Sequence, residues 1–149
     1  MKKTKICLKT LLGFLLLASQ ILLLGCSKKP SELSLYDETK ACKDIIAKIP
    51  EDTISNIGVD VSFSYSGDMR CLIEDSYYVE IYDNSNWYNI DEGNYVFKSI
   101  GYILESNVPF TMKYDWKNRY GVLSRGTYRI IIPVSLNGTS SFIAVPFSI

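Results

Sequence analysis

Apolar and polar residues alternate over much of the second half of the chain. Three stretches place apolar side chains at every second position: Val59 to Tyr65, Val108 to Trp116, and Tyr128 to Leu136. Successive side chains of a β-strand point to opposite faces of its sheet, so a period of two is typical of strands that bury one face. The pattern therefore predicts half-buried strands in these three stretches.

Polar turns separate the predicted strands at intervals of about ten residues. Residues 83–86 read Asp-Asn-Ser-Asn, residues 91–94 read Asp-Glu-Gly-Asn, and Asn137-Gly138 is a pair favoured in tight hairpins. The first and third of these turns predict hairpins. Short strands with frequent turns predict an all-β sandwich of about seven strands over residues 51–149.

A different period precedes the strands, in residues 36–50. Cys42, Ile45, Ile46 and Ile49 recur at the three- and four-residue spacing of one helix face, and a proline follows that would end a helix. The spacing predicts one short amphipathic helix whose apolar face covers an end or a face of the sandwich.

Residues 1–25 have the composition of a signal peptide. Four lysines lie among the first nine residues, and a nearly unbroken apolar run follows from Leu11 to Leu24. A helix over that run would reach about 21 Å, which is short of the roughly 30 Å hydrocarbon core of a bilayer. A permanent transmembrane anchor is therefore the weaker interpretation.

The tetrapeptide Leu23-Leu24-Gly25-Cys26 resembles a bacterial lipobox, in which a peptidase cuts before a cysteine whose sulfur carries a diacylglyceryl group. The resemblance implies that Cys26 is lipidated and that the mature chain is held at the extracytoplasmic face of the cell membrane. Two acyl chains suffice for stable anchoring. Residues 26–35 are mostly polar and would form the lipidated end and a flexible tether.

Length and charge limit the number of domains and the classes of partner. Without residues 1–25 the chain has 124 residues, enough for one domain, with 12 basic and 16 acidic side chains. This net negative charge argues against nucleic acid as the main partner.

The remaining cysteines allow either a disulfide or two free thiols. Cys7 lies in the signal peptide and Cys26 is the expected lipid site, which leaves Cys42 and Cys71. Closing a loop of roughly 30 residues would stabilise the fold by about 3–4 kcal/mol. A catalytic thiol is not expected, because the sequence has no histidine to act as its base.

The segment from Tyr120 to Ile130 carries a second resemblance. Its Leu-x-x-Gly-x-Tyr pattern ends in Gly126 and Tyr128 and resembles the tyrosine corner of immunoglobulin-like domains, where the tyrosine hydroxyl bonds back to the loop. With Asp115-Trp116 before it, the pattern is similar to bacterial Ig-like domains of lipoproteins and other exported proteins. The resemblance implies an Ig-like β-sandwich and no settled activity, and only the structural roles of Gly126 and Tyr128 carry over.

Aromatic residues suggest where a partner would bind. Tyr78 and Tyr82 share the phase of Glu80 and are expected to face solvent, and Tyr88 follows in the next strand. An exposed group of these three tyrosines would form an apolar patch typical of a binding surface.

No metal or cofactor site is expected. Adjacent acidic pairs occur in turns, but the sequence contains no spaced calcium-binding loop, and zinc or copper would require histidine or more cysteines. No phosphate-binding loop, nucleophile elbow or zinc-protease motif occurs either. We therefore expect a protein that is not an enzyme.

The sequence as a whole favours a membrane-anchored surface lipoprotein. Its Ig-like domain would be a non-catalytic binding or adhesion module for a protein or another component of the cell envelope. The alternative is a lipid-anchored inhibitor that presents one loop to an extracytoplasmic hydrolase.

Overall fold

A computed structural model describes residues 30–92, 95–96 and 100–149. In these residues, ten strands form two antiparallel sheets. The smaller sheet consists of β2 (Ile45–Lys48), β3 (Gly58–Tyr65) and β8 (Phe110–Asp115). The larger sheet has the spatial order β1 (Pro30–Leu33), β6 (Asn86–Ile90), β5 (Tyr78–Asp83), β9 (Thr127–Leu136), β4 (Cys71–Glu74) and β7 (Gly101–Leu104), and β10 (Thr139–Ser148) pairs with β9. Two short 3-10 helices are η1 (Glu38–Lys40) and η2 (Glu51–Thr53).

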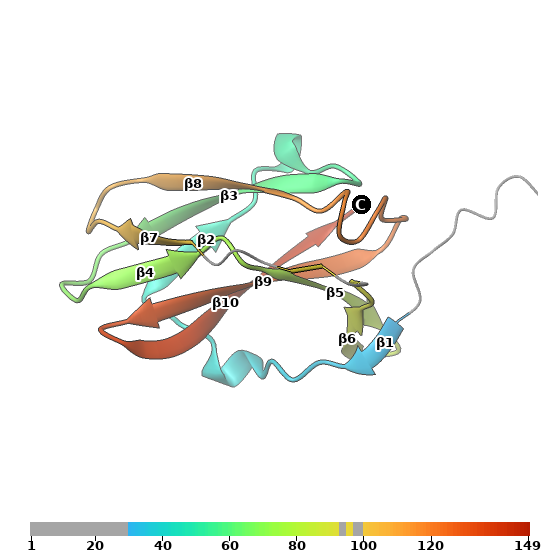
Figure 1. Ribbon diagram of the computed structural model, residues 1–149, viewed down its shortest axis with the longest axis horizontal. Helices are drawn as coiled ribbons and strands as arrows, with labels where there is room; N and C mark the ends of the chain where they lie inside the picture. Colours follow the sequence, from blue (N-terminus) through green and yellow to red (C-terminus); the bar gives the residue numbers. More distant parts are fainter. Residues whose placement is uncertain (1–29, 93–94, 97–99) are drawn as a thin grey trace, which may run out of the picture.

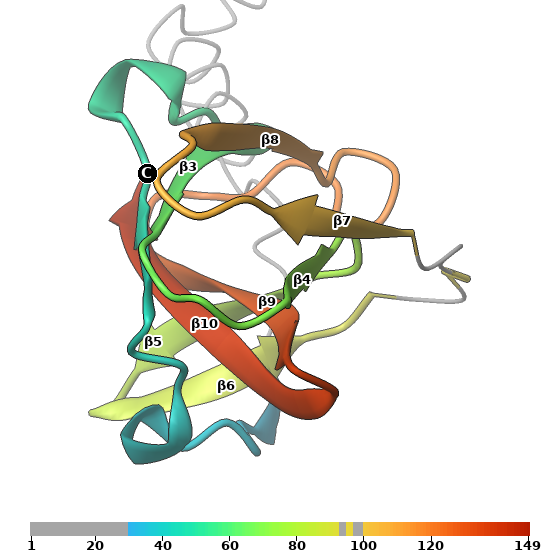
Figure 2. The same ribbon diagram turned by 90° about the vertical axis from the view of Figure 1, so that its left-hand side faces the viewer.

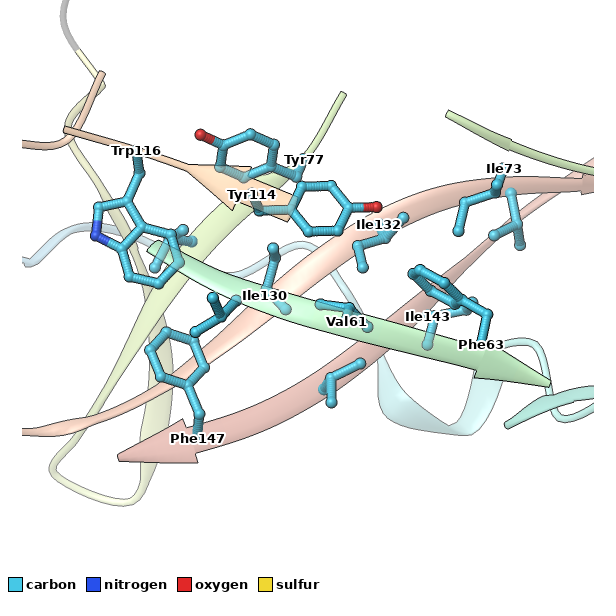
Figure 3. Packing of buried hydrophobic residues seen from close by; sticks show 14 of the residues in the cluster. Val61, Phe63, Ile73, Tyr77, Tyr114, Trp116, Ile130, Ile132, Ile143 and Phe147 are labelled. Atoms are coloured by element: carbon cyan, nitrogen blue, oxygen red, sulfur yellow. The ribbon is translucent and has the colours of Figure 1, made fainter. Parts of the chain in front are cut away.

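The two sheets pack face to face around one hydrophobic core. In Figure 1 and, turned by 90°, in Figure 2, β3 and β8 lie over β9 and β10. Figure 3 shows buried side chains from both sheets meeting in the space between them, among them Val61, Phe63, Tyr114, Ile130 and Ile132. The predicted all-β sandwich is confirmed: the described residues of 51–149 hold eight strands, close to the expected seven, and β1 and β2 precede them.

The alternating pattern assigns the core-facing side chains correctly. On β3, Val59, Val61, Phe63 and Tyr65 are all buried, and on β9 the residues of the same phase as Tyr128 are buried as far as Val134. Burial of these side chains is the main favourable term that holds the two sheets together.

Both predicted hairpins are present. Asn84 and Ser85 have φ angles of 45° and 67° in the turn between β5 and β6, and Asn137 and Gly138 have φ angles of 47° and 86° in the turn between β9 and β10. A two-residue turn with positive φ at both central positions twists with the flanking strands. The turns therefore set the registers in which Asp83 faces Asn86 and Leu136 faces Thr139.

The helix predicted for residues 36–50 is wrong. The segment forms η1, the strand β2 and an extended connection, and Ile45 is buried while Ile46 is 60% exposed. Asp37 does accept a hydrogen bond from Thr39 N at 3.0 Å, as a helix N-cap would. This helical turn has three residues, and β2 further along pairs with β3 and places Ile45 and, in part, Ala47 in the core.

The tether predicted for residues 26–35 is also wrong over its second half. Residues 30–33 form β1, which pairs with β6 so that Pro30 faces Ile90 and Leu33 faces Tyr88. Ser31 Oγ also donates to Asn89 O at 3.0 Å. A proline suits the first position of an edge strand, because no neighbouring strand needs its missing N–H.

Candidate functional site

The chain between β1 and β2 crosses the outer face of the larger sheet. Residues 34–42 are called the strap from here on. Backbone hydrogen bonds fix its two ends, from Ser34 N to Trp87 O at 2.9 Å and from Cys42 N to Phe142 O at 2.7 Å. The strap runs along the lower side of the molecule in Figure 1, below β5 and β10. The strap covers a sheet face that the alternation of apolar and polar residues alone predicts to be exposed to solvent.

Tyr36 is the central aromatic residue of the strap. Its ring lies 5.8 Å from the Tyr78 ring and 5.0 Å from the Phe142 ring, measured between centroids. Burial, the nearby Tyr78 hydroxyl and the Glu80 carboxylate raise the pKa of Tyr36 to about 12. The phenol is therefore neutral in physiological conditions and packs as an apolar wall with a polar tip.

A buried ion pair lies beneath the strap. Arg129 Nε donates to Glu80 Oε2 at 2.6 Å, and the two residues are 1% and 0% exposed. The other guanidinium nitrogens donate to the strap, to Glu38 Oε1 at 2.8 Å, Ser34 Oγ at 3.1 Å and Tyr36 O at 3.0 Å. Arg129 lies on the polar phase of the alternating stretch from Tyr128 to Leu136, and these hydrogen bonds join the strap to the sheet.

A second buried arginine lies near the end of β6. Arg119 donates hydrogen bonds to Tyr77 O and to Glu92 Oε2. Its Cζ atom lies 5.2 Å from the Tyr78 ring centroid and 4.8 Å from that of Tyr120. Burial lowers the pKa of Arg119, which the neighbouring tyrosines partly offset. The buried Arg119 guanidinium thus packs against the Tyr78 and Tyr120 rings and helps to fix their positions.

A cleft of about 470 Å³ opens at the β1 edge of the larger sheet, next to the strap. Its lining comes from β1 and the strap, from β5 and β6, and from the chain after β6: Ser31, Glu32, Leu35, Tyr36, Tyr78, Val79, Asn89, Ile90, Asp91, Glu92 and Tyr120. Buried Val79, Ile90 and Tyr120 contribute apolar surface. The charged side chains in this lining are carboxylates only.

The three tyrosines predicted to form one exposed patch are not brought together. Tyr78 is half-buried and lines the cleft beside Tyr36. Tyr82 is 46% exposed and lies against Trp87, with ring centroids 5.0 Å apart. Tyr88 faces Ile81 across the β5–β6 pair and so lies on the opposite face of the sheet from Tyr82. Of the three, only Tyr78 belongs to the cleft.

Several cleft residues were not identified as site residues from the sequence. The sequence pattern predicts a helix at Tyr36 and a polar turn at Asp91 and Glu92, and it places Tyr120 only at the start of the corner segment. All of these residues lie near β6 in the folded protein. They come together only when β1 pairs with β6, which the sequence pattern does not predict.

The corner hydrogen bond expected from the resemblance is present. Tyr128 Oη donates to Ser124 O at 2.8 Å, four residues upstream. A Cβ atom on Gly126 would lie 3.2 Å from the Tyr128 ring, so the glycine lets the ring approach the loop closely. The corner fixes the entry of the chain into β9.

Of the two alternatives open for Cys42 and Cys71, a disulfide or two free thiols, this structure has two free thiols. Burial raises the pKa of Cys71 to about 11, so its thiol stays protonated. The expected lipid site Cys26 lies outside the described residues, as do the predicted signal peptide and the first part of the tether.

Two further properties concern the described residues alone. They contain no group of three or more histidine, cysteine, aspartate or glutamate side chains placed to hold a metal ion. Nor does any helix among them have the length and apolar composition needed to cross a membrane.

Two antiparallel sheets packed face to face, with a tyrosine corner leading into β9, define an immunoglobulin-like sandwich. The family model of a bacterial Ig-like domain matches residues 43–143, and the chain belongs to that family. Such domains are typically non-catalytic and fit a binding or adhesion module. Searches of curated proteins and of solved structures each found no significant match.

Proposed function

We propose that this protein is a lipid-anchored surface protein whose bacterial Ig-like domain is a non-catalytic binding module. The lipobox-like tetrapeptide ending in Cys26 supports the anchor, and the family supports the module. The partner is a protein or another component of the cell envelope, met on the extracytoplasmic side of the membrane.

The cleft beside the strap is the binding site in this proposal. The observation that carries this assignment is the cleft itself, which has a volume of about 470 Å³ and includes Tyr36, Tyr78 and Tyr120 in its walls. Ligand sites are commonly clefts of about 300–1,000 Å³ with aromatic walls and a few polar groups. Sandwich domains are scaffolds on which such sites are added, so the site and not the fold defines the function.

The position of the strap gives the cleft a basis beyond the family fold. Residues 43–143 match the family, whereas β1 and the strap precede them. Four of the eleven lining residues, including Glu32 and Tyr36, therefore lie outside the matched part. In our proposal the N-terminal segment converts a common sandwich into a specific binding protein.

The anchor would hold the cleft near the membrane. Four peptide steps separate Cys26 from Pro30, and at about 3.3–3.6 Å per residue they span at most about 14 Å. Because β1 forms one wall of the cleft, the ligand would be a component found close to the membrane surface.

Mass spectrometry of the protein from purified membranes tests the anchor. We expect an N-terminus at a diacylglyceryl-modified Cys26, and we expect a Cys26→Ser variant to retain residues 1–25 without the lipid. Release of an unlipidated wild-type chain from washed membranes would contradict the anchor.

Capture of an envelope partner tests the binding site. Full-length protein in detergent would be used as bait, with Tyr36→Ala to remove one wall and Tyr36→Phe to keep the ring. We expect the wild type and Tyr36→Phe to capture the same partner and Tyr36→Ala to lose it. A Tyr102→Ala variant, which changes an exposed tyrosine on β7, is the control for general loss of aromatic surface.

If Tyr36→Ala captures the partner as well as the wild type does, and thermal unfolding verifies that the variant is folded, the binding site does not lie in the cleft. If the captured partner is a hydrolase that loses activity in the complex, the inhibitor role is supported instead of adhesion.

A further inference from the structure

The charge of the cleft narrows the chemistry of its ligand. Glu32 lies on β1, and Asp91 and Glu92 follow the paired strand β6, so the lining carboxylates come from neighbouring strands at this edge of the sheet. The Arg119 guanidinium is paired with Glu92 and packed among tyrosine rings below. The lining therefore attracts a cationic group and repels an anionic one.

The walls of the cleft suit a flat ring with hydroxyl groups. The Tyr36 and Tyr78 rings are tilted by 37° to each other, and the buried Tyr120 ring lies among the lining residues. Aromatic faces pack against the apolar face of a ring, and tyrosine hydroxyls hydrogen-bond at its edge. Burial raises the pKa values of Tyr36 and Tyr120 to about 12, so both phenols stay neutral and their rings present no negative charge to a ligand.

Polar groups near the ends of the cleft complete the recognition surface. Ser31 and Asn89 lie on the paired strands β1 and β6, where Ser31 Oγ donates to Asn89 O. Tyr120 Oη donates to Glu92 Oε2 at 3.3 Å and so turns this carboxylate toward the tyrosines. Hydroxyl groups of a ligand would meet both donors and acceptors at these positions.

We propose that the cleft binds a sugar ring that carries a protonated amine, as part of a cell-envelope component. The amine lies between Glu32 and Asp91, and the ring packs against Tyr36 and Tyr78. This inference rests on the proposed function of the cleft and adds the class of ligand.

Three monosaccharides that share one ring and differ in charge provide the test. Binding of glucosamine, N-acetylglucosamine and glucuronic acid to the full-length protein in detergent would be measured by ligand-observed NMR. We expect glucosamine to bind about tenfold more tightly than the neutral N-acetylglucosamine. Glucuronic acid should give no saturable binding.

A double variant tests the role of the rim. Glu32→Gln and Asp91→Asn change exposed residues and leave the Arg119–Glu92 pair intact. We expect the pair of changes to weaken glucosamine binding about tenfold and to leave N-acetylglucosamine binding within about twofold. Glu105→Gln, in the exposed turn after β7, is the matched control and should change neither.

Several outcomes would overturn the ligand class. They are no binding of glucosamine, equal binding of all three sugars, tighter binding of glucuronic acid, or an unchanged affinity in the double variant. Equal competition by an Nα-acetyl-lysine amide would show that an amine alone suffices and that no sugar ring is recognised. If Tyr36→Ala still loses the captured partner, only the ligand class has failed, whereas capture by Tyr36→Ala removes the site itself.

Discussion

At the scale of single residues, the buried Arg129 is the most informative side chain of the fold. It lies on the β9 face opposite the main core, yet it is 1% exposed because the strap closes over it. An arginine supplies donors in several directions, and here they join Glu80 to three groups of the strap. The ion pair is thus a local means of holding a segment that is distant in sequence.

Replacing Arg129 by methionine tests this role. Arg129→Met leaves the Glu80 carboxylate buried without its cation, and we expect the free energy of unfolding to fall by about 3–5 kcal/mol. Urea unfolding measures the change. Arg125→Met, at an exposed position in the corner loop, should change the free energy by less than about 0.5 kcal/mol.

A double variant separates the lost pair from lost packing. Glu80→Leu together with Arg129→Met removes both charges, so much of the lost stability should return. A double variant that is as unstable as Arg129→Met would show that the guanidinium hydrogen bonds to the strap dominate, and not the buried charge of Glu80 left without its cation.

The residue-scale pattern could be predicted for one sheet face only. Alternation identifies Tyr128 and Ile130 as core residues, because their burial depends on the strand itself. Arg129 belongs to the other phase, and its burial depends on residues more than ninety positions earlier in the chain. Periodicity within a strand contains no information on such a distant cover.

At the scale of elements, the strand β2 replaces an expected helix. Isoleucines at positions 45, 46 and 49 fit a helix face, but positions 45, 47 and 49 fit a strand equally well. β-branched side chains favour the strand, and pairing of β2 with β3 satisfies its backbone. A short apolar segment is therefore decided by its neighbours in space rather than by its own spacing.

Two alanine variants distinguish the strand from the helix. Ile45→Ala removes a core side chain and should lower the free energy of unfolding by about 2–4 kcal/mol. Ile46→Ala changes a side chain that is 60% exposed and should change it by less than about 1 kcal/mol. Equal losses in denaturant unfolding would instead indicate a helix that buries both isoleucines.

At the scale of the whole molecule, burial of phenols and a thiol predicts loss of stability in alkaline solution. Burial raises the pKa of Cys71 from 9.0 to about 11, and those of Tyr36, Tyr77 and Tyr120 from 10.0 to about 12. The unfolded chain therefore releases these protons at lower pH than the folded chain does. Stability from these groups is complete below about pH 9 and decreases as the pH rises toward about 12.

Urea unfolding as a function of pH measures this decrease. Tyr36→Phe should show a smaller decrease than the wild type, because one shifted phenol is gone. A free energy of unfolding that stays constant over this range would contradict the burial of the tyrosines around the cleft.

The sandwich could be predicted from the sequence, whereas the cleft could not. The alternation along each strand, the hairpin turns and the Gly126–Tyr128 corner are local features that can be recognised in short segments of the sequence. The cleft instead depends on β1 pairing with β6, which places Glu32 and Tyr36 beside Tyr78. Such a site arises from long-range packing, so composition indicated only that many tyrosines were present.

Hydrogen exchange measured by mass spectrometry tests the central claim most directly. The full-length protein would be compared with and without its captured envelope partner. We expect slower exchange in peptides that contain residues 31–36 and 89–92, because ligand in the cleft restrains both walls. Protection confined to residues 102–108, in β7 and the turn after it, with no change at the strap, would contradict the assignment of the cleft as the binding site.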